Sequence, residues 1–179
     1  MEPSNTSLVD PDSSKPVQAP IELRDGEIQL HTISGEDAAA LVQFHHRLSP
    51  ETTYLRFFSV HPELSSLELD HFTHVDHHDR EALVATSDDE IVGVGRFDRL
   101  SGSADAEAAF VVADRWQGKG LGTALFARLA ARAREVGVER FTAEVLPHNS
   151  RMLKLFAHAG LPMTSAVRGG DVHVMIEIG

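Results

Sequence analysis

The sequence predicts an α/β protein in which one mixed sheet carries helices on both faces. Segments of alternating or β-branched apolar residues take turns with segments whose apolar residues recur every three to four positions. Along the chain the predicted strands alternate with predicted helices, a pattern that favours a sheet covered by helices. The 179 residues, 42% of them hydrophobic, suffice for one core, so a single folded domain is expected.

The first residues differ in composition from the rest of the chain. Residues 1–22 are rich in Pro, Ser and Asp and show no apolar periodicity. Such a segment buries too little apolar surface to offset the entropy lost on ordering it. We therefore predict a disordered leader over residues 1–22 and a folded domain over residues 23–179.

Each predicted element carries a local signal at one of its ends. Ser34 and Ser49 are suited to cap helices, and Pro50 suits a first helical position. Gly137 and Gly160 suit the carboxyl ends of two later helices. The predicted strands cover residues 27–33, 81–86, 90–99, 104–113, 140–146, 163–167 and 172–178. The predicted helices cover residues 34–47, 66–72, 121–136 and 151–159, with one more helix beginning at Ser49.

The strand over residues 104–113 leads into a glycine-rich turn that is suited to hold a phosphate. Three glycines alternate in the run Gly118-Lys119-Gly120-Leu121-Gly122, and an amphipathic helix follows at once. Because glycine lacks a Cβ, several backbone amides can converge there, and the helix dipole and Lys119 add positive charge. The spacing matches neither a P-loop nor a dinucleotide-binding turn. A glycine-rich turn that binds nothing is the alternative.

With Gln117 ahead of it, the turn reads Gln-x-x-Gly-x-Gly, which resembles the pyrophosphate loop of the GCN5-related N-acetyltransferase (GNAT) superfamily. The resemblance implies a mixed, mostly antiparallel sheet and acetyl-CoA as co-substrate. It also implies that Asn149 and Phe156, which follow the next strand, contact the cofactor, although Asn149 can also simply cap a helix. The residues predicted to bind the cofactor are Phe110, Val111, Val112, Gln117, Gly118, Lys119, Gly120, Leu121, Gly122, Thr123, Asn149 and Phe156.

Three further stretches, residues 48–58, 75–79 and 82–85, resemble the Pat-type bacterial protein lysine acetyltransferases, and this likeness covers about residues 23–165. It implies transfer of an acetyl group to the ε-amine of a lysine in a protein such as an acyl-CoA synthetase. Acetylation of a small amine and non-catalytic sensing of acyl-CoA are the alternative functions. Tyr54 and Arg56 either pack within their helix or shape the entrance for the acceptor.

An acceptor lysine must lose a proton before it attacks, because its pKa of about 10.4 makes the neutral amine cost about 4.6 kcal/mol at pH 7. Two carboxylates stand in the apolar strands beside the predicted cofactor site, Glu107 and Glu144. The resemblance favours Glu107 as the base, with Glu144 as second choice, and a glutamate in solvent is the alternative for each. Phe156 stands where many family members have a tyrosine that protonates the leaving thiolate, so the acid is unassigned. The backbone at Phe110 to Val112 is expected to hold the thioester oxygen.

Composition excludes several other kinds of chemistry. The chain contains no cysteine, so there is no thiol nucleophile, and direct attack of the amine on the thioester is expected.

The net charge of -11 argues against a nucleic-acid partner, although eight of the sixteen Lys and Arg residues fall between Arg115 and Lys154, near the predicted phosphate site. Without a membrane-length apolar run or a signal-peptide pattern, the sequence predicts a cytoplasmic protein that does not bind membranes.

Histidines and aspartates gather between the predicted helix at 66–72 and the strand at 81–86. They are His71, His74, Asp76, His77, His78 and Asp79. Their spacing matches no recognised zinc motif. We predict that no metal binds here and that the segment is a polar loop near the acceptor entrance.

Overall fold

The computed structural model describes residues 17–179, and residues 1–16 lie outside that range. Its strands are β1 (Val17–Leu23), β2 (Gly26–Thr32), β3 (Arg80–Ser87), β4 (Glu90–Arg99), β5 (Asp105–Val112), β6 (Arg140–Val145), β7 (Met163–Arg168) and β8 (Asp171–Glu177). Its α-helices are α1 (Ala38–Arg47), α2 (Pro50–Phe57), α3 (Ser66–Thr73), α4 (Leu121–Glu135) and α5 (Ser150–Ala157), and short 3-10 turns cover Gly35–Asp37 and Asp114–Trp116. The predicted α/β class is confirmed.

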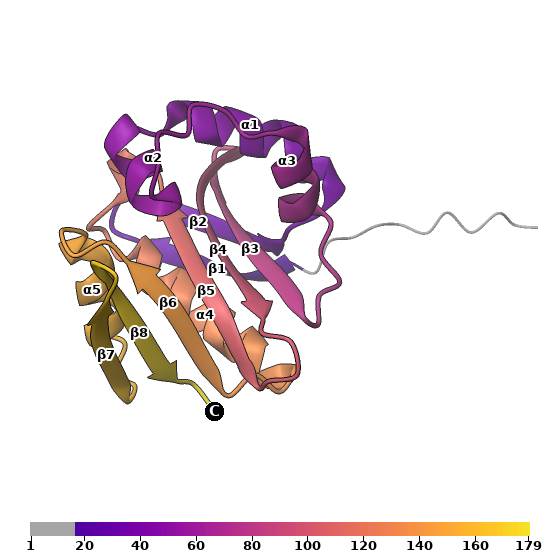
Figure 1. Cartoon of the computed structure of the whole chain (residues 1–179). Helices are drawn as coiled ribbons and strands as arrows, with labels where there is room; N and C mark the ends of the chain where they lie inside the picture. Colours follow the sequence, from indigo (N-terminus) through magenta and orange to yellow (C-terminus); the bar gives the residue numbers. More distant parts are fainter. Residues whose placement is uncertain (1–16) are drawn as a thin grey trace, which may run out of the picture.

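The strands form one sheet in the order β1-β2-β3-β4-β5-β6-β8-β7 (Figure 1). Neighbouring strands run antiparallel throughout, except that β5 and β6 are parallel. The sheet is therefore mixed and mostly antiparallel, as the sequence resemblance implied.

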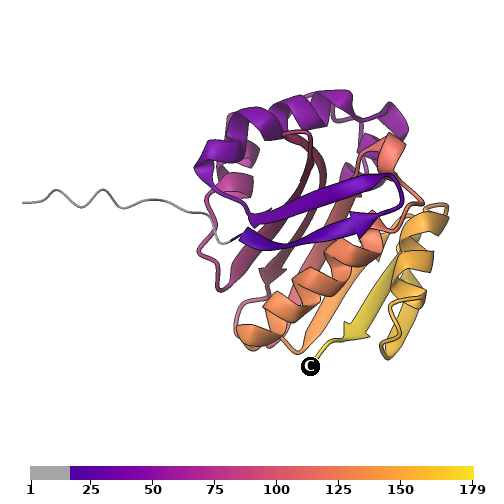
Figure 2. The ribbon, with the colours of Figure 1, turned by 180° about the vertical axis from the view of Figure 1, so that it is seen from behind.

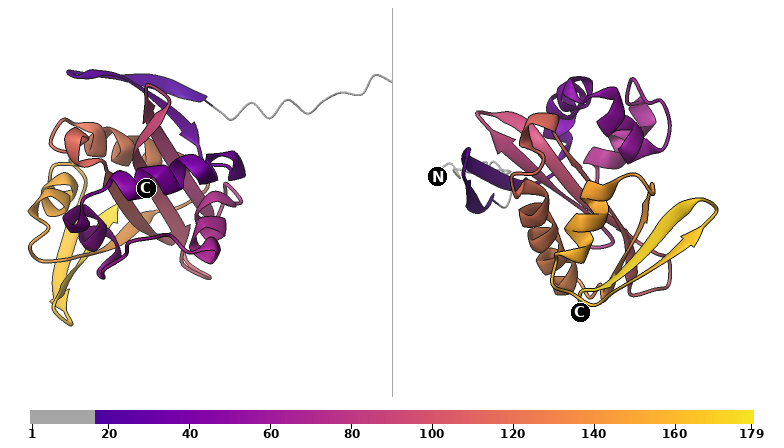
Figure 3. Two further views of the ribbon diagram at one scale, coloured as in Figure 1. Left: turned by 90° about the horizontal axis from the view of Figure 1, so that it is seen from above. Right: turned by 90° about the vertical axis from the view of Figure 1, so that its left-hand side faces the viewer.

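Helices cover both faces of this sheet. Helices α1, α2 and α3 lie on one face, and α4 and α5 lie on the other (Figure 3, right). Helix α4 packs across β3, β4 and β5, as the view from behind shows (Figure 2), while α1 rests on β4 and α2 on β5. Residues 91–97 of β4 are buried in succession, because helices cover both of its faces. The core is accordingly divided into two apolar clusters, one on each side of the sheet.

The structure corrects the predicted boundary at residue 23. Residues 17–22, predicted as the end of the leader, form most of β1, which pairs with β2 at the edge of the sheet. Pro20 obscures this strand in the sequence, because proline cannot donate a ladder hydrogen bond. It lies where the β1–β2 register shifts, between Gln18 and Ile21, and an edge strand tolerates a proline at such an irregularity. The remainder of the predicted leader, residues 1–16, lies outside the described residues.

The parallel pair β5 and β6 separates part of the way along its length. Pairing runs only from Asp105 with Arg140 to Glu107 with Thr142, although β5 continues to Val112. On its other side β5 stays paired with β4 as far as Val112. The edge of β5 that faces β6 is therefore without a strand partner from Ala108 onward, and this opening positions the candidate site.

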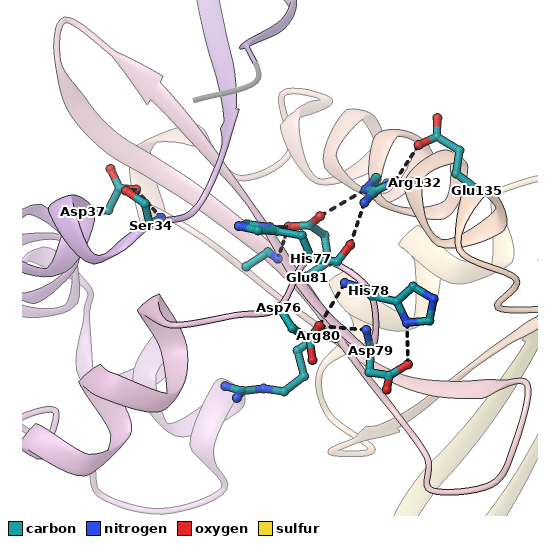
Figure 4. A network of polar contacts seen from close by, with 11 residues as sticks. Ser34, Asp37, Asp76, His77, His78, Asp79, Arg80, Glu81, Arg132 and Glu135 are labelled. Carbon is teal, nitrogen blue, oxygen red and sulfur yellow. Dashed lines mark hydrogen bonds and ion pairs between the residues drawn. The ribbon is translucent and has the colours of Figure 1, made fainter. Parts of the chain in front are cut away.

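A buried carboxylate links strand β3 to helix α4. Glu81 of β3 has no exposed side-chain surface, and its carboxylate accepts hydrogen bonds from Arg132 Nε at 3.1 Å and from the Ala82 amide at 3.0 Å. His77 Nδ1 lies 2.9 Å from the same carboxylate, and Arg132 also donates to the His77 carbonyl at 2.6 Å (Figure 4). The carboxylate is thus fully partnered, as a buried charge requires.

The histidine-rich segment forms ion pairs and a turn. His71, His74 and His78 each lie within 3.6 Å of an aspartate carboxylate. Asp76 accepts hydrogen bonds from the backbone amides of residues 78, 79 and 80. Burial alone would raise the pKa of Asp76, but these bonds outweigh it and hold the pKa below its usual value. Among residues 17–179, no group of three or more His, Asp or Glu side chains is arranged to hold a metal.

Within the same described range, no helix has the length and apolar character needed to cross a bilayer.

Candidate active site

A groove of about 450 Å³ runs along the free edge of β5. It is enclosed by the glycine loop, one side of α5 and one side of α2. The groove is lined by Thr52, Leu55, Arg56, Phe110, Val111, Val112, Gln117, Gly118, Gly120, Gly122, Thr123, Asn149, Arg151, Met152, Lys154, Leu155 and His158. Most of the residues predicted to bind the cofactor therefore meet in one place.

The glycine loop presents a run of unused backbone amides. Gly118 and Gly120 have φ angles of 72° and 94°, in the left-handed region that glycine adopts without strain. The amides from Gly118 to Thr123 have no acceptor among the described residues, and those of Leu121 to Thr123 begin α4. An anion at this point would receive their hydrogen bonds and the favourable end of the helix dipole.

Gly122 is required for close packing rather than for an unusual backbone angle. A Cβ at this position would lie 2.7 Å from Leu155 Cδ1, whose side chain lines the groove. The glycine therefore lets α4 and α5 approach each other at the groove.

We predict that Gly122→Ala weakens acetyl-CoA binding by about 1 kcal/mol, roughly fivefold, because the new methyl displaces Leu155 into the groove. Stability should not fall, since alanine favours a helix over glycine. Calorimetric titration of acetyl-CoA measures the change. The control is the same substitution in a Leu155→Ala background, where the side chain that the methyl would displace is already shortened. There, Gly122→Ala should leave the affinity for acetyl-CoA unchanged. An equal loss of affinity from Gly122→Ala in both backgrounds would contradict this explanation.

Gln117 joins the three elements around the loop. Its Nε2 donates to the Val112 carbonyl and to Thr52 Oγ1, each at 3.0 Å. Its Oε1 accepts a hydrogen bond from Arg151 at 2.6 Å. The side chain thus ties the end of β5 to α2 and α5, and this role differs from the direct cofactor contact that the sequence predicts.

Asp114 anchors the start of α2 beside the loop. Its carboxylate accepts hydrogen bonds from Ser49 N at 3.0 Å, Ser49 Oγ at 2.6 Å and Thr52 Oγ1 at 2.7 Å. Burial raises the pKa of Asp114, but the bonds from Ser49 and Thr52 outweigh burial and hold the pKa below its usual value.

We predict that Asp114→Asn lowers the free energy of unfolding at neutral pH, by no more than about 1 kcal/mol because the group is exposed. Because the pKa of Asp114 is lower in the folded protein than in the unfolded chain, its contribution to the free energy of unfolding is fully present above the unfolded pKa of about 3.9. It is lost as the pH falls through the folded pKa. Urea unfolding at pH 7 and below pH 4 measures this, with Glu51→Gln on the same helix as the control. A difference from wild type that does not shrink at low pH would contradict the prediction.

Three cationic or titratable side chains on α5 and directly after it line the groove but were not among the residues predicted to bind the cofactor. They are Arg151, Lys154 and His158. The spacing of three and four residues places them on one side of a helix, and this was the available signal. They give the groove positive charge on a molecule whose net charge is -11.

Three residues predicted to bind the cofactor do not line the groove. Lys119 instead forms an ion pair with Asp25 in the β1–β2 turn, 2.6 Å from Nζ to the carboxylate. The side chain of Leu121 is fully buried in the core, although its amide belongs to the loop. Phe156 is 1% exposed and packs against Phe110 and Phe126, with its edge lining the neighbouring cavity.

Asn149 lies where the groove meets this neighbouring cavity. Its Oδ1 accepts a hydrogen bond from the Met152 amide at 3.1 Å, so the predicted cap of α5 is present. It also lines both cavities, and its contact with the cofactor stays a prediction.

The neighbouring cavity, of about 230 Å³, holds both candidate bases, and we call it the glutamate cavity. It is lined by Leu55, Arg56, Phe57, Phe58, Glu107, Ala108, Ala109, Phe110, Ala143, Glu144, Val145, Asn149, Met152 and Phe156. The Glu107 side chain is exposed and has no hydrogen-bond or ion-pair partner among the described residues, whereas the Glu144 carboxylate lies 3.4 Å from His173 Nδ1 of β8. Tyr54, which was considered for the acceptor entrance, is 42% exposed and lines neither cavity.

Comparison with known proteins agrees with this geometry. The acetyltransferase (GNAT) family model matches residues 52–161, which include most of α2, the glycine loop, both glutamates and α5. Acetyltransferase Pat from Mycolicibacterium smegmatis is 34% identical over 145 residues, which cover 79% of this chain and 43% of that protein. This chain therefore spans less than half the length of that relative.

Two solved structures share the fold. The GNAT domain of S. lividans PAT has a TM-score of 0.84 at 39% identity, covering 89% of this chain and 96% of that one. The structure of yncA from Salmonella typhimurium with its cofactor acetyl-CoA has a TM-score of 0.68 at 19% identity, covering 85% and 94%. The predicted family is confirmed. The chain belongs to the acetyltransferase (GNAT) family.

Proposed function

We propose that this protein transfers the acetyl group of acetyl-CoA to the ε-amine of a lysine in a protein, by direct attack of the amine on the thioester. One observation carries the proposal. The groove that begins at the free amides of the glycine loop opens directly onto the cavity that contains Glu107 and Glu144. A long anionic donor in the groove and an amine in the glutamate cavity would therefore meet.

Acetyl-CoA suits the groove chemically. Its diphosphate would accept hydrogen bonds from the amides of residues 118–123, and Arg151 and Lys154 would offset its negative charge. The pantetheine arm can bond to the edge of β5 that β6 leaves without a partner. The same edge offers main-chain donors near Val111 for the oxygen of the thioester.

In this mechanism Glu107 removes the proton that the attacking amine must lose. Glu107, Ala109 and Val111 share one face of β5, and four residues of strand span about 13 Å. The small side chain of Ala109 leaves that space open for the amine and for a water that relays the proton. The amine nitrogen forms a bond to the carbonyl carbon, and the bond between that carbon and sulfur then breaks, releasing CoA as its thiolate.

The acceptor class is inferred from the relatives. The name of the mycobacterial relative, Pat, and the sequence resemblance favour a protein lysine, such as one in an acyl-CoA synthetase. Glu107 and Glu144 give the cavity a negative character that suits a cationic lysine. We include in the proposal the cytoplasmic location, the lack of a metal and the lack of a nucleic-acid or membrane partner that the sequence predicts.

Cell lysate incubated with labelled acetyl-CoA and the purified protein tests the acceptor class. Label on specific lysines of proteins is the expected result, and the Glu107→Gln protein at the same concentration corrects for uncatalysed acetylation. Label only on small amines would replace the protein acceptor with a small molecule. Tight binding of acetyl-CoA without transfer to any acceptor would instead favour a sensor.

A further inference from the structure

The proposed reaction leaves negative charge on sulfur without an obvious group to stabilise it. Phe156 occupies the position where a tyrosine would supply a proton, and it is buried among other phenylalanines. A charge that develops at a bond-breaking atom is stabilised best by a positioned charge or dipole of opposite sign. A stabilising group must therefore lie at the junction of the groove and the glutamate cavity, where the thioester would lie.

Arg56 of α2 lies at this junction. Five residues line both cavities, namely Leu55, Arg56, Phe110, Asn149 and Met152. Of these, Arg56 alone is charged. Asn149 caps α5 through its side-chain oxygen and has only a neutral amide donor to offer an anion. Arg56 also borders a third cavity of about 40 Å³ between α1, α3 and the sheet, so empty space surrounds it on several sides.

Arg56 lacks the carboxylate partner that its neighbours possess. Asp98 binds Arg96 Nη2 at 2.9 Å and Arg80 Nε at 3.2 Å. No hydrogen bond or ion pair joins the Arg56 guanidinium to any residue from 17 to 179, although its central carbon lies 4.9 Å from the centre of the Phe57 ring. A half-buried guanidinium with no anion is costly unless a ligand supplies one.

The charges around Arg56 also indicate that its guanidinium lacks an anionic partner. Burial and, after it, the positive charge of Arg96 lower the pKa of Arg56 to about 10, with Glu107 and Asp98 acting in the opposite sense. Arg56 therefore stays charged at neutral pH, and its charge is poorly compensated. A nearby anion would be stabilised strongly in this partly dehydrated setting.

We propose that Arg56 is a catalytic residue that stabilises the CoA thiolate as it leaves, an inference that rests on the proposed function. As the bond between carbon and sulfur breaks, its electron pair passes to sulfur, and the Arg56 guanidinium faces that charge. The proton lost by the amine passes to Glu107, and solvent later delivers a proton to the thiolate. No proton leaves Arg56.

The acidic character of the glutamate cavity argues against the other anion that Arg56 could bind, a carboxylate on the acceptor. Glu107 and Glu144 would repel such a group throughout the space that the acceptor must cross. The thiolate reaches Arg56 from the groove side instead.

The pKa of the thiol of bound coenzyme A tests the proposal without turnover. Ultraviolet absorbance of the thiolate, followed in a pH titration of wild-type protein with coenzyme A, should give a thiol pKa below that of free coenzyme A. Arg56→Gln should raise this pKa by about one unit and lower kcat by about tenfold, with the KM for acetyl-CoA within about threefold of wild type. Arg56→Lys should fall between the two.

Arg168→Gln provides the matched control, because it removes the same charge from an exposed position on β7, outside both cavities. The other charged groups that face the site, Glu107, Glu144, Arg96, Asp98, Arg151, Lys154 and His158, are the same in all variants. A difference between Arg56→Gln and the control therefore reports the Arg56 charge.

A bound thiol in wild-type protein with the same pKa as free coenzyme A would overturn the proposal, even if Arg56→Gln fails to fold. So would an Arg56→Gln protein that keeps the wild-type thiol pKa but loses affinity only for acidic acceptors, a result that assigns Arg56 to the acceptor. Failure of the wild-type protein to bind coenzyme A, or to transfer acetyl groups, would instead overturn the proposed function.

Discussion

Replacing Glu107 with glutamine is expected to lower kcat by about 10²- to 10⁴-fold, the contribution of a positioned general base. Glutamine has nearly the same shape but cannot take the proton from the attacking amine. Because the Glu107 side chain is exposed and makes no hydrogen bond within the described part of the chain, the fold should be unaffected. Initial rates at saturating acetyl-CoA, with calorimetric affinity for acetyl-CoA measured in parallel, separate lost chemistry from lost binding.

Glu144→Gln is the matched control for this experiment. Both carboxylates line the same cavity, but Glu144 lies on β6 and is close to His173. We expect kcat within about threefold of wild type for Glu144→Gln. The reverse pattern would make Glu144 the base, and small effects from both changes would exclude either glutamate from that role.

Replacing Glu81 with glutamine is expected to lower the free energy of unfolding by about 3 kcal/mol, because it leaves Arg132 without its buried partner. This is near the lower end of the range for breaking a buried ion pair, since the Arg132 side chain is 27% exposed and water can partly replace the lost contact. The amide nitrogen of glutamine would also face a donor, either Arg132 or the backbone of Ala82. Urea unfolding monitored by circular dichroism gives the change.

Glu135→Gln tests whether the effect depends on burial. Glu135 binds the same arginine, 2.9 Å from Arg132 Nη1, but its side chain is 65% exposed. Its replacement should cost less than about 1 kcal/mol. If the two glutamates have equal effects, the buried network around Glu81 does not stabilise the fold in the way described here.

Short sequence signals, such as caps and turn residues, were sufficient to predict most of the helices and strands. The caps at Ser49 and Asn149 are present, and Asp88 and Asp89 adopt the left-handed angles of a tight hairpin turn between β3 and β4. Such features depend on hydrogen bonds or backbone angles within a few residues, so the sequence carries them directly. Strand β1 was missed because its order depends on pairing with β2, which compensates for a proline within the strand.

The candidate site was only partly predictable for the same reason. The glycine spacing identified the loop, because backbone freedom is a property of those residues alone. The partner of Lys119 could not be found this way, since Asp25 reaches it only after the β1–β2 hairpin folds beside the loop. The position of Arg56 between cavities likewise depends on how α2 packs over β5, a tertiary contact with no periodic signature.

The pairing of β1 with β2 has a practical consequence for anyone who shortens the protein. Starting at residue 23, as composition alone would suggest, deletes nearly all of β1 and leaves β2 as the outermost strand. The unsatisfied amides and carbonyls of β2 could then recruit the same strand of another molecule, a common route to aggregation. A shortened protein that retains Val17 keeps this edge covered.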